Sequence, residues 1–359
     1  MTPTIETPTP VRSERLKACY RRRGSSMAQG FAVRTLSGLA AGTVIALLAP
    51  RLTTHAQTPS TLQSPSTASG SSWTSPRTPW GDPDLQGVWN YGTMTPLERP
   101  AQWAGRDVLS EEEAQAYEKQ TVARRAEANN TAGPDWWEPE NNVLRSRRTS
   151  LIVEPANGRL PPAAEQPQGR GAGRGRGGRG GAYDNPESLS LQDRCITWPA
   201  AGPPMMPTVY NNNVKIVPTR DHVVLVNEMI HVARIVPMND QPRDGFRYLH
   251  GDPRGHWEGS TLVVDTINFD GRLNFRNTGD RLHLVERFTR TGEDTLEYRF
   301  TVEDAQTWTA PWTARIDMSK TQGLMFEFAC HEGNYRSVTG ILSGARYVER
   351  QAASPDSPR

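Results

Sequence analysis

Apolar and polar residues alternate along residues 255–312, and this alternation is the strongest structural pattern in the chain. Side chains on a strand point to opposite faces in turn, so Leu296, Tyr298, Phe300 and Val302 share one face of a predicted strand. Three segments rich in β-branched and aromatic residues, separated by Gly, Asn and Asp, predict an antiparallel meander over 261–266, 282–289 and 295–302.

The predicted strand 282–289 has one acid on its apolar face. Two leucines and a phenylalanine form that face, and Glu286 falls in the same register. A buried carboxylate either pairs with a cation or has a raised pKa. Paired with Arg234 or Arg287, Glu286 would be structural; unpaired in a cavity, it could act as a general acid or base.

Shorter strand signals and one helix signal occupy the rest of the chain. Strands are predicted at 85–91, 151–153, 214–217, 222–227, 230–236, 313–318 and 324–328. A surface helix from Glu111 to Glu127 is predicted, because Ser110 and Glu113 have the spacing of a capping box. Residues 251–255 are read as a connection, and 330–335 as a loop against the core. The pattern predicts a mainly β fold, an antiparallel barrel or sandwich with one peripheral helix.

The first 56 residues have the features of a secretory signal peptide. Basic residues precede an apolar run at 36–48, and Thr54-His55-Ala56 resembles the small-residue cleavage site of a signal peptide. Met27 is a second candidate start, which gives a leader of ordinary length. The apolar run is too short to span a bilayer comfortably, so we expect a secreted or periplasmic protein without a membrane span in the mature chain; the alternative is an uncleaved anchor.

Composition predicts one folded domain between two disordered segments. Residues 57–79 are rich in Ser, Thr, Pro and Gln and read as a disordered spacer, and 350–359 as a frayed tail. The single β-rich domain then covers 80–349. An Arg/Gly-rich segment at 159–181 inside it is interpreted as a loop insert.

The charge of the chain argues against one class of partner, and its cysteine content predicts a disulfide. Residues 1–56 hold eight Lys/Arg and two Asp/Glu, so 41 − 8 = 33 basic and 39 − 2 = 37 acidic residues remain, a net charge of −4. Nucleic acid is therefore not an expected partner, because its binding needs a clustered positive surface. Without Cys19, Cys195 and Cys330 remain as an even pair, which predicts a disulfide, with two buried free thiols as the alternative.

No short motif identifies a metal, cofactor or nucleophile. The sequence contains no H-x-H or H-E-x-x-H pattern, no Gly-x-Ser-x-Gly elbow, no P-loop and no dinucleotide fingerprint between a predicted strand and a helix, so no metal or cofactor is predicted. A metal site assembled across strands stays as an alternative, from His250, His256 and His331 with Glu332 or Asp265.

Several long strings carry a resemblance to a known family. With PWGDPDLQGVW, VLVNEMIHVARIVP, GHWEGSTLVVDTINF, LHLVERFTR and ACHEGN, the chain resembles a large family of exported bacterial proteins of unassigned activity, over roughly residues 80–346 apart from the Arg/Gly-rich insert. The resemblance implies export and a β-rich fold, and it transfers no catalytic residue. Gly87-Val88-Trp89 and Gly255-His256-Trp257 are also similar to the Gly-x-Trp strings of lipocalin-like barrels.

Three functional hypotheses follow. The first is a barrel or sandwich that binds an apolar or aromatic small molecule in its interior; its candidate ligand-binding residues are Trp89, Trp257, Tyr298, Phe288, Met229, Glu228 and Arg234. The second is a hydrolase or isomerase on the same scaffold, with candidate catalytic residues Glu286, Asp265, His283 and His331. The third is a structural envelope protein without a ligand.

Overall fold

A computed structural model describes residues 73–128, 142–165 and 185–353, except 199, 209, 240, 241 and 274. All of them belong to the unit Ser69–Arg359. Several predicted features lie outside the described residues: the signal peptide, most of the spacer, most of the Arg/Gly-rich insert and residues 354–359 of the tail.

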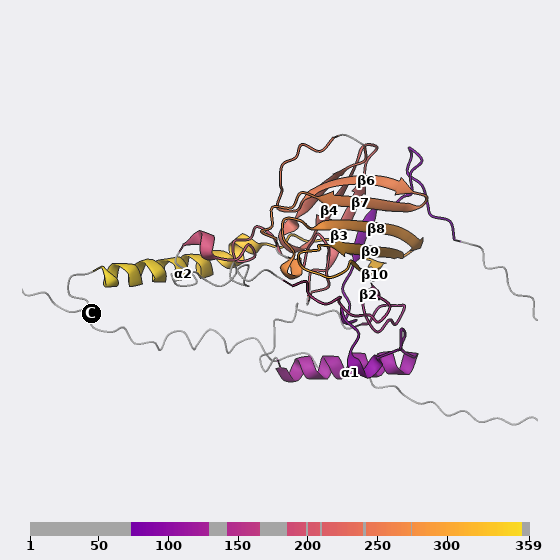
Figure 1. Ribbon diagram of the computed structural model, residues 1–359, viewed down its shortest axis with the longest axis horizontal. Coiled ribbons are helices and arrows are strands. Elements are labelled where there is room, and N and C mark those ends of the chain that lie inside the picture. Colours follow the sequence, from indigo (N-terminus) through magenta and orange to yellow (C-terminus); the bar gives the residue numbers. More distant parts are fainter. Residues whose placement is uncertain are drawn as a thin grey trace, which may run out of the picture. The chain divides into compact units, whose positions relative to one another are not determined.

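The described strands form one antiparallel sheet that curls into a nearly closed barrel (Figure 1). Nine of them follow the order β5-β4-β3-β1-β10-β9-β8-β7-β6, and β2 also pairs with β10. Their bounds are β1 Gly87–Asn90, β2 Ile152–Glu154, β3 Asn213–Pro218, β4 His222–Asn227, β5 Ala233–Pro237, β6 Asp252–Glu258, β7 Thr261–Ile267, β8 His283–Gly292, β9 Thr295–Glu303 and β10 Trp312–Lys320. The predicted mainly β, antiparallel fold is confirmed, and of the two predicted forms, barrel or sandwich, it is the barrel.

Two short strands share one flank of β10. Its C-terminal half pairs with β1, where Trp89 lies opposite Lys320, and its N-terminal half pairs with β2, where Ala314 lies opposite Ile152. On its other side β1 pairs with β3, so that Trp89 lies opposite Val214. The four-residue strand β1 therefore connects the β3-β4-β5 hairpins to the β6–β10 meander.

The barrel is nearly closed where β5 approaches β6. Gly255 on β6 allows this approach, because a Cβ there would lie 2.9 Å from Val236 Cγ1 on β5 and 2.5 Å from Met238 Sδ. The absence of a side chain at position 255 therefore sets how near the two edge strands come.

The inner faces of the strands carry the core. Burial alternates along β8 from His283 to Arg290 and along the whole of β9, as the sequence pattern predicts. Inside the barrel, the rings of Phe288 and Tyr298 are 4.9 Å apart, those of Tyr298 and Phe300 are 5.6 Å apart, and those of Phe300 and Trp312 are 5.7 Å apart. A continuous aromatic cluster thus fills the middle of the barrel.

The predicted first helix is present as α1, Glu111–Ala128. Its capping box forms: the Glu113 amide donates to Ser110 Oγ at 3.2 Å, and the Ser110 amide donates to Glu113 Oε2 at 2.9 Å. Trp103, Leu109 and Ala114 join the start of α1 to the neighbouring chain as a small buried cluster.

A second long helix, α2 at Cys330–Ala352, was not expected from the sequence. The predicted loop at 330–335 is wrong, and residues 350–352 belong to this helix rather than to a tail. Three glycines between residues 333 and 344 weaken the helix signal, because glycine is a poor helix former. Neither α1 nor α2, the long helices in the described part of the chain, is both long and apolar enough to cross a bilayer.

Two smaller predictions are also corrected. Residues 324–328 are not a strand, and the predicted connection at 251–255 is largely strand β6. Short 3-10 helices complete the described structure; they are η1 Ala101–Trp103, η2 Pro186–Ser188, η3 Met229–His231 and η4 Phe275–Asn277.

Candidate functional site

A bidentate ion pair lies inside the barrel. Arg234 on β5 donates to Glu286 on β8 through Nη1 to Oε2 at 2.6 Å and Nη2 to Oε1 at 3.0 Å. Both side chains are almost fully buried. Tyr298 Oη donates to Glu286 Oε1 at 2.7 Å, and the Met205 amide donates to Tyr298 Oη at 3.1 Å. Of the two cations that the sequence offers, Arg234 is the partner of Glu286.

In this interior network the carboxylate of Glu286 is paired with the guanidinium of Arg234, whose Nε has no hydrogen-bond partner among the described residues. Burial opposes the charge on Arg234, but the neighbouring Glu286 outweighs it and raises the pKa of the guanidinium. Burial and then Glu286 raise the pKa of Tyr298, so its hydroxyl stays a donor. The other predicted cation, Arg287, lies on the outer face and donates to Glu258 Oε2 at 2.8 Å. The geometry is that of a structural strut across the barrel.

His250 lies next to this network and contacts Thr197. Its Nε2 is 3.0 Å from Thr197 Oγ1, and Thr197 is fully buried. Burial, followed by the positive charge of Arg234, lowers the pKa of His250 to about 4. His250 is therefore neutral at physiological pH.

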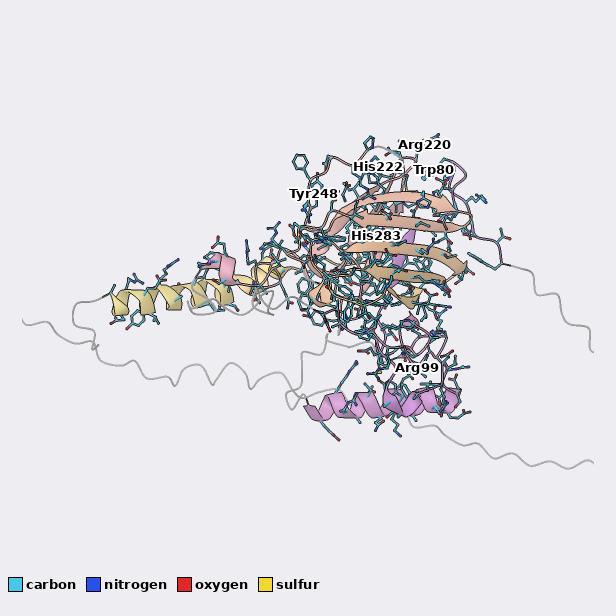
Figure 2. The ribbon with its side chains drawn as sticks, viewed as in Figure 1. Trp80, Arg99, Arg220, His222, Tyr248 and His283 are labelled. Carbon is cyan, nitrogen blue, oxygen red and sulfur yellow. A yellow bond between two sulfur atoms is a disulfide. The ribbon has the colours of Figure 1, made fainter. Side chains whose placement is uncertain are left out.

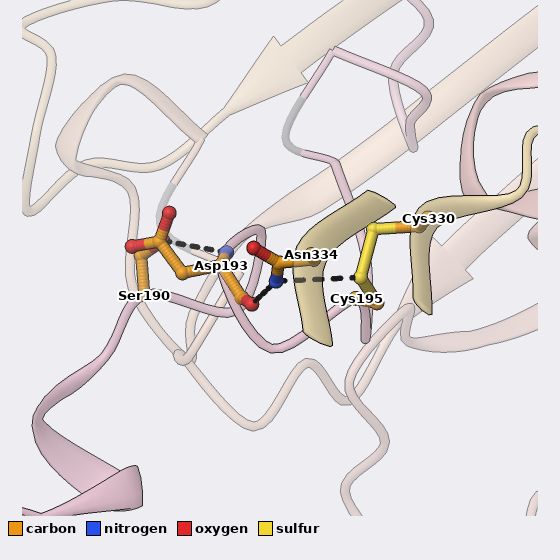
Figure 3. The surroundings of a disulfide bond; sticks show 5 residues. All are labelled: Ser190, Asp193, Cys195, Cys330 and Asn334. Atoms are coloured by element: carbon orange, nitrogen blue, oxygen red, sulfur yellow. Dashed lines mark hydrogen bonds between the residues drawn. A yellow bond between two sulfur atoms is a disulfide. The ribbon is translucent and has the colours of Figure 1, made fainter. Parts of the chain in front are cut away.

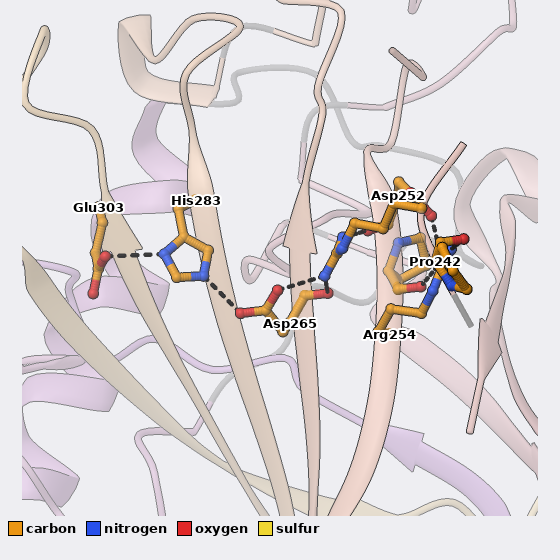
Figure 4. A network of polar contacts seen from close by, with 8 residues as sticks. Pro242, Asp252, Arg254, Asp265, His283 and Glu303 are labelled. Atoms are coloured by element: carbon orange, nitrogen blue, oxygen red, sulfur yellow. Dashed lines mark hydrogen bonds and ion pairs between the residues drawn. The ribbon is translucent and has the colours of Figure 1, made fainter. Parts of the chain in front are cut away.

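A second polar network crosses the outer face of β7, β8 and β9 (Figure 4). His283 Nε2 is 2.7 Å from Asp265 Oδ2, and His283 Nδ1 is 2.9 Å from Glu303 Oε2. Arg243 Nη2 also donates to Asp265, at 2.6 Å from Oδ1. Partial burial lowers the pKa of His283, but the two carboxylates outweigh it and raise that pKa. An imidazolium that donates from both nitrogens has no free lone pair to act as a base.

The four candidate catalytic residues do not gather at one place. Asp265 and His283 are in contact on the outer face, whereas Glu286, three positions from His283 on β8, points into the interior. His331 is an exposed residue in the first turn of α2. In the described part of the chain, no group of three or more His, Cys, Asp or Glu side chains is arranged to hold a metal ion.

The candidate ligand-binding residues divide into two groups. Trp89, Phe288 and Tyr298 have no exposed surface, so protein atoms cover them on all sides; Arg234 pairs with Glu286, and Trp257 is half-buried against the core. A ligand among the fully buried side chains would have to displace them. Met229 and Glu228 instead lie in the β4–β5 connection, at one end of the barrel.

A pocket of about 470 Å³ opens at this end, where β1 and β4 end and β3 begins. Its described lining consists of three aromatic residues, four asparagines, two glutamates and an alanine: Tyr210, Phe326, Phe328, Asn90, Asn211, Asn212, Asn213, Glu228, Glu327 and Ala329. We call it the barrel-end pocket. Apart from Glu228, none of its residues was among the predicted site residues.

The string Tyr210-Asn211-Asn212-Asn213 builds one wall of the barrel-end pocket. Asn211 has a φ of +55°, a left-handed conformation that asparagine tolerates better than most residues. The side chain of Asn212 closes the loop, since Oδ1 accepts from the Thr208 amide at 2.7 Å and Nδ2 donates to the Thr208 carbonyl at 3.0 Å. The sequence signal that could have identified this wall is the run of three asparagines that follows a Pro-rich segment.

Asn213 then positions the carboxylate of the pocket. Its Oδ1 accepts from Thr321 Oγ1 at 2.8 Å, and its Nδ2 donates to Glu228 Oε2 at 2.7 Å. The Glu228 amide donates to the Asn213 carbonyl at 2.9 Å. Glu228 is only 8% exposed, and Asn213 holds it through both its side-chain carboxylate and its backbone amide.

The opposite wall is the segment directly before α2. The rings of Phe328 and Tyr210 stack on each other, with centroids 6.3 Å apart and planes 28° apart, and both residues line the pocket. Behind them, Ala201, Met229, Ile230 and Val232 form a buried apolar cluster that Phe328 and Cys330 join.

The predicted disulfide joins Cys330 to Cys195 and fastens this wall (Figure 3). Asn334, one turn further along α2, donates to the Asp193 carbonyl and lies 3.7 Å from Cys195 Sγ. Ser190 Oγ in turn donates to Asp193 Oδ2 at 2.7 Å. The start of α2, and with it the wall at 326–329, is thereby tied to residues 190–195.

A second pocket, of about 430 Å³, lies beside η1 and has a different character. It is lined by Arg99 and Arg159 with small and polar residues, and its described lining contains no aromatic side chain. Arg99, labelled in Figure 2, is already engaged: its Nε donates to Thr149 Oγ1 at 3.0 Å and its Nη2 pairs with Asp107 at 2.5 Å. Because Arg99 is engaged in this way, this pocket is a weaker candidate for a ligand site than the barrel-end pocket.

Comparison of the chain with protein-family models, with curated proteins and with solved structures finds no match.

Proposed function

We propose that this protein binds a small molecule with an apolar or aromatic body, and that the barrel-end pocket holds it. The observation that carries the proposal is the combination of three aromatic side chains with amides and carboxylates in one pocket. Its volume of about 470 Å³ falls in the range of small-molecule sites, roughly 300–1,000 Å³. The ligand site thus lies at the end of the barrel rather than in the middle of it.

The exposure of Phe326 supports this proposal. Its side chain is 70% exposed at the rim of the pocket, although it is large and apolar. Leu324, two residues earlier, is 79% exposed. Exposed apolar side chains beside a concave site are typical of ligand-binding surfaces, because the ligand covers them.

The same proposal places the protein outside the cytoplasm. Disulfides form and persist in oxidising compartments, and the Cys195–Cys330 bond fastens one wall of the pocket. Together with the leader-like composition of residues 1–56, this supports a secreted or periplasmic binding protein.

The test is a fluorescence titration with N-phenyl-1-naphthylamine, an uncharged aromatic probe. We expect saturable binding to the purified protein and at least about fivefold weaker binding to F326A, because a stacking surface is lost. The matched control is F246A, since Phe246 is 68% exposed and does not line the pocket. Equal affinities for all three proteins, or no saturable binding, would refute the proposal. A structural envelope protein predicts that second outcome.

A further inference from the structure

We infer that the natural ligand of the barrel-end pocket is an organic cation, with an ammonium-type centre attached to an apolar or aromatic body. This inference rests on the proposed function and specifies the ligand class for the same site. It follows from the charge of the lining, the burial of Glu228 and the arrangement of the aromatic rings.

The charged groups of the pocket all have one sign. Its ten described lining residues include two carboxylates, Glu228 and Glu327, and no Lys, Arg or His. Opposite charges attract strongly in a partly desolvated site, and like charges are excluded from it. An anionic ligand is therefore disfavoured and a cationic one favoured.

Glu228 differs from the other buried glutamate in what surrounds it. Glu286 is fully buried and receives a bidentate arginine. Glu228 is 8% exposed, and its hydrogen bond comes from the neutral amide of Asn213. Among the described residues, no Lys, Arg or His forms an ion pair with it. Burying a carboxylate without a counter-charge is costly, and a bound cation would remove that cost.

The phenol of Tyr91 is close enough to Glu228 to be affected by its negative charge. The phenol of Tyr91 is buried, and burial followed by the charge of Glu228 raises its pKa. Tyr91 follows Asn90, which lines the pocket at the end of β1. Tyr91 therefore stays a neutral phenol and brings no positive charge that would offset Glu228.

The aromatic residues supply the second element of cation recognition. The face of an aromatic ring carries negative electrostatic potential, and ammonium groups bind over it, most strongly when several rings surround them. Tyr210 and Phe328 stack at 6.3 Å, and Phe326 stands exposed beside them. Rings and carboxylates together fit a cationic head with an apolar body.

An inorganic cation fits the pocket less well. Calcium and magnesium take six or more oxygen ligands, several of them carboxylate oxygens from side chains close together. The described residues show no cluster of three metal-ligating side chains, and the aromatic rings would offer such an ion no ligand. An organic cation uses both kinds of lining residue.

Calorimetric titration of the purified protein with three matched probes tests this inference. Benzyltrimethylammonium carries the charge, neopentylbenzene is its uncharged carbon isostere, and phenylacetate is the anion. We expect the cation to bind at least about tenfold more tightly than the isostere and phenylacetate not to bind. E228Q should lower the affinity for the cation about tenfold and leave that for the isostere unchanged.

The control variant is E293Q, because Glu293 lies in the β8–β9 turn, away from the lining of the pocket. Equal affinity for cation and isostere, or no effect of E228Q, would overturn the inference while the binding of N-phenyl-1-naphthylamine still supported the proposed function. Binding of Ca²⁺ without binding of the organic cation would also overturn it. Failure of every probe would refute the proposed function itself.

Discussion

Glu286 accepts three hydrogen bonds, two from Arg234 and one from Tyr298, in the interior of the barrel. Deleting one partner of a buried pair leaves the other charge without compensation, which typically costs about 3–5 kcal/mol. We therefore expect E286A to lower the free energy of unfolding by about that amount, measured by urea denaturation.

A paired substitution separates charge from packing. In R234M/E286L both charges are replaced by apolar groups of similar size. We therefore expect its loss of unfolding free energy to be well below the sum of the losses in R234M and E286L measured separately. If E286A alone cost less than about 1 kcal/mol, the ion pair would not be the strut described above.

His283 should set the pH dependence of stability near neutrality. Its pKa in the fold is raised above the ordinary 6.5 because hydrogen bonds to Asp265 and Glu303 outweigh partial burial. The folded state thus binds this proton more tightly, so its stabilisation is complete below pH 6.5 and is lost as the pH rises through the folded pKa. We expect unfolding free energies in urea to fall with rising pH over this window in the wild type.

H283Q should flatten that profile, and F246A, an exposed substitution that removes no titratable group, should not. His250 does not interfere, because its pKa is lowered to about 4 and its effect on stability lies below pH 6.5. An unchanged slope in H283Q would show that another group titrates.

The disulfide and the start of α2 fix the position of one wall of the barrel-end pocket. The wall residues 326–329 directly precede Cys330, and this cysteine is bonded to Cys195. We expect C195S/C330S to lose about 2–4 kcal/mol of stability, as is typical for disulfides that close long loops. Hydrogen exchange should then accelerate at 326–335 and stay unchanged along β8 and β9.

Probe binding gives a second readout of the same change. Because the wall loses its tether, C195S/C330S should bind N-phenyl-1-naphthylamine more weakly than the wild type. A wild-type affinity, together with unchanged exchange at 326–335, would mean that packing of Phe328 and Tyr210 holds the wall without the covalent bond.

The elements that could be predicted from the sequence are those with strong local signals. The alternation of buried and exposed residues along β8 and β9 and the capping box of α1 depend on residues close together in the sequence. Both are present in the structure. Strand β6 contains Pro253 and Gly255, which weaken the strand signal. Helix α2 contains glycines that weaken the helix signal.

The candidate site was harder to predict because its parts are remote in sequence. The barrel-end pocket combines Asn90, the loop 210–213, Glu228 and the segment 326–329. Local patterns identify which residues are polar or aromatic. The order of β1, β3 and β4 in the sheet and the Cys195–Cys330 disulfide bring the four segments together. By contrast, Asp265 and His283, which were both singled out, are in contact because β7 and β8 are adjacent in the sheet.

For the whole molecule, Gly255 controls the approach of the edge strands β5 and β6. A branched side chain there would meet Val236 and Met238, so we expect G255V to destabilise the protein by about 1–3 kcal/mol in urea denaturation. The control is G279A, because a Cβ at Gly279 would have no heavy atom within 4 Å. Equal effects of the two variants would show that β5 and β6 do not approach in solution.

The position of β1 has a consequence for the folding kinetics. The pairings within β3–β5 and β6–β10 join neighbours in the chain, whereas Trp89 must find Lys320 to complete the sheet. Loop-closure entropy and contact order both make such a remote pairing slow. We expect pulse-labelling hydrogen exchange to protect β8 and β9 before β1. Until β1 docks, the edges of β3 and β10 remain open to pairing with other chains, so refolding at high concentration should favour aggregation.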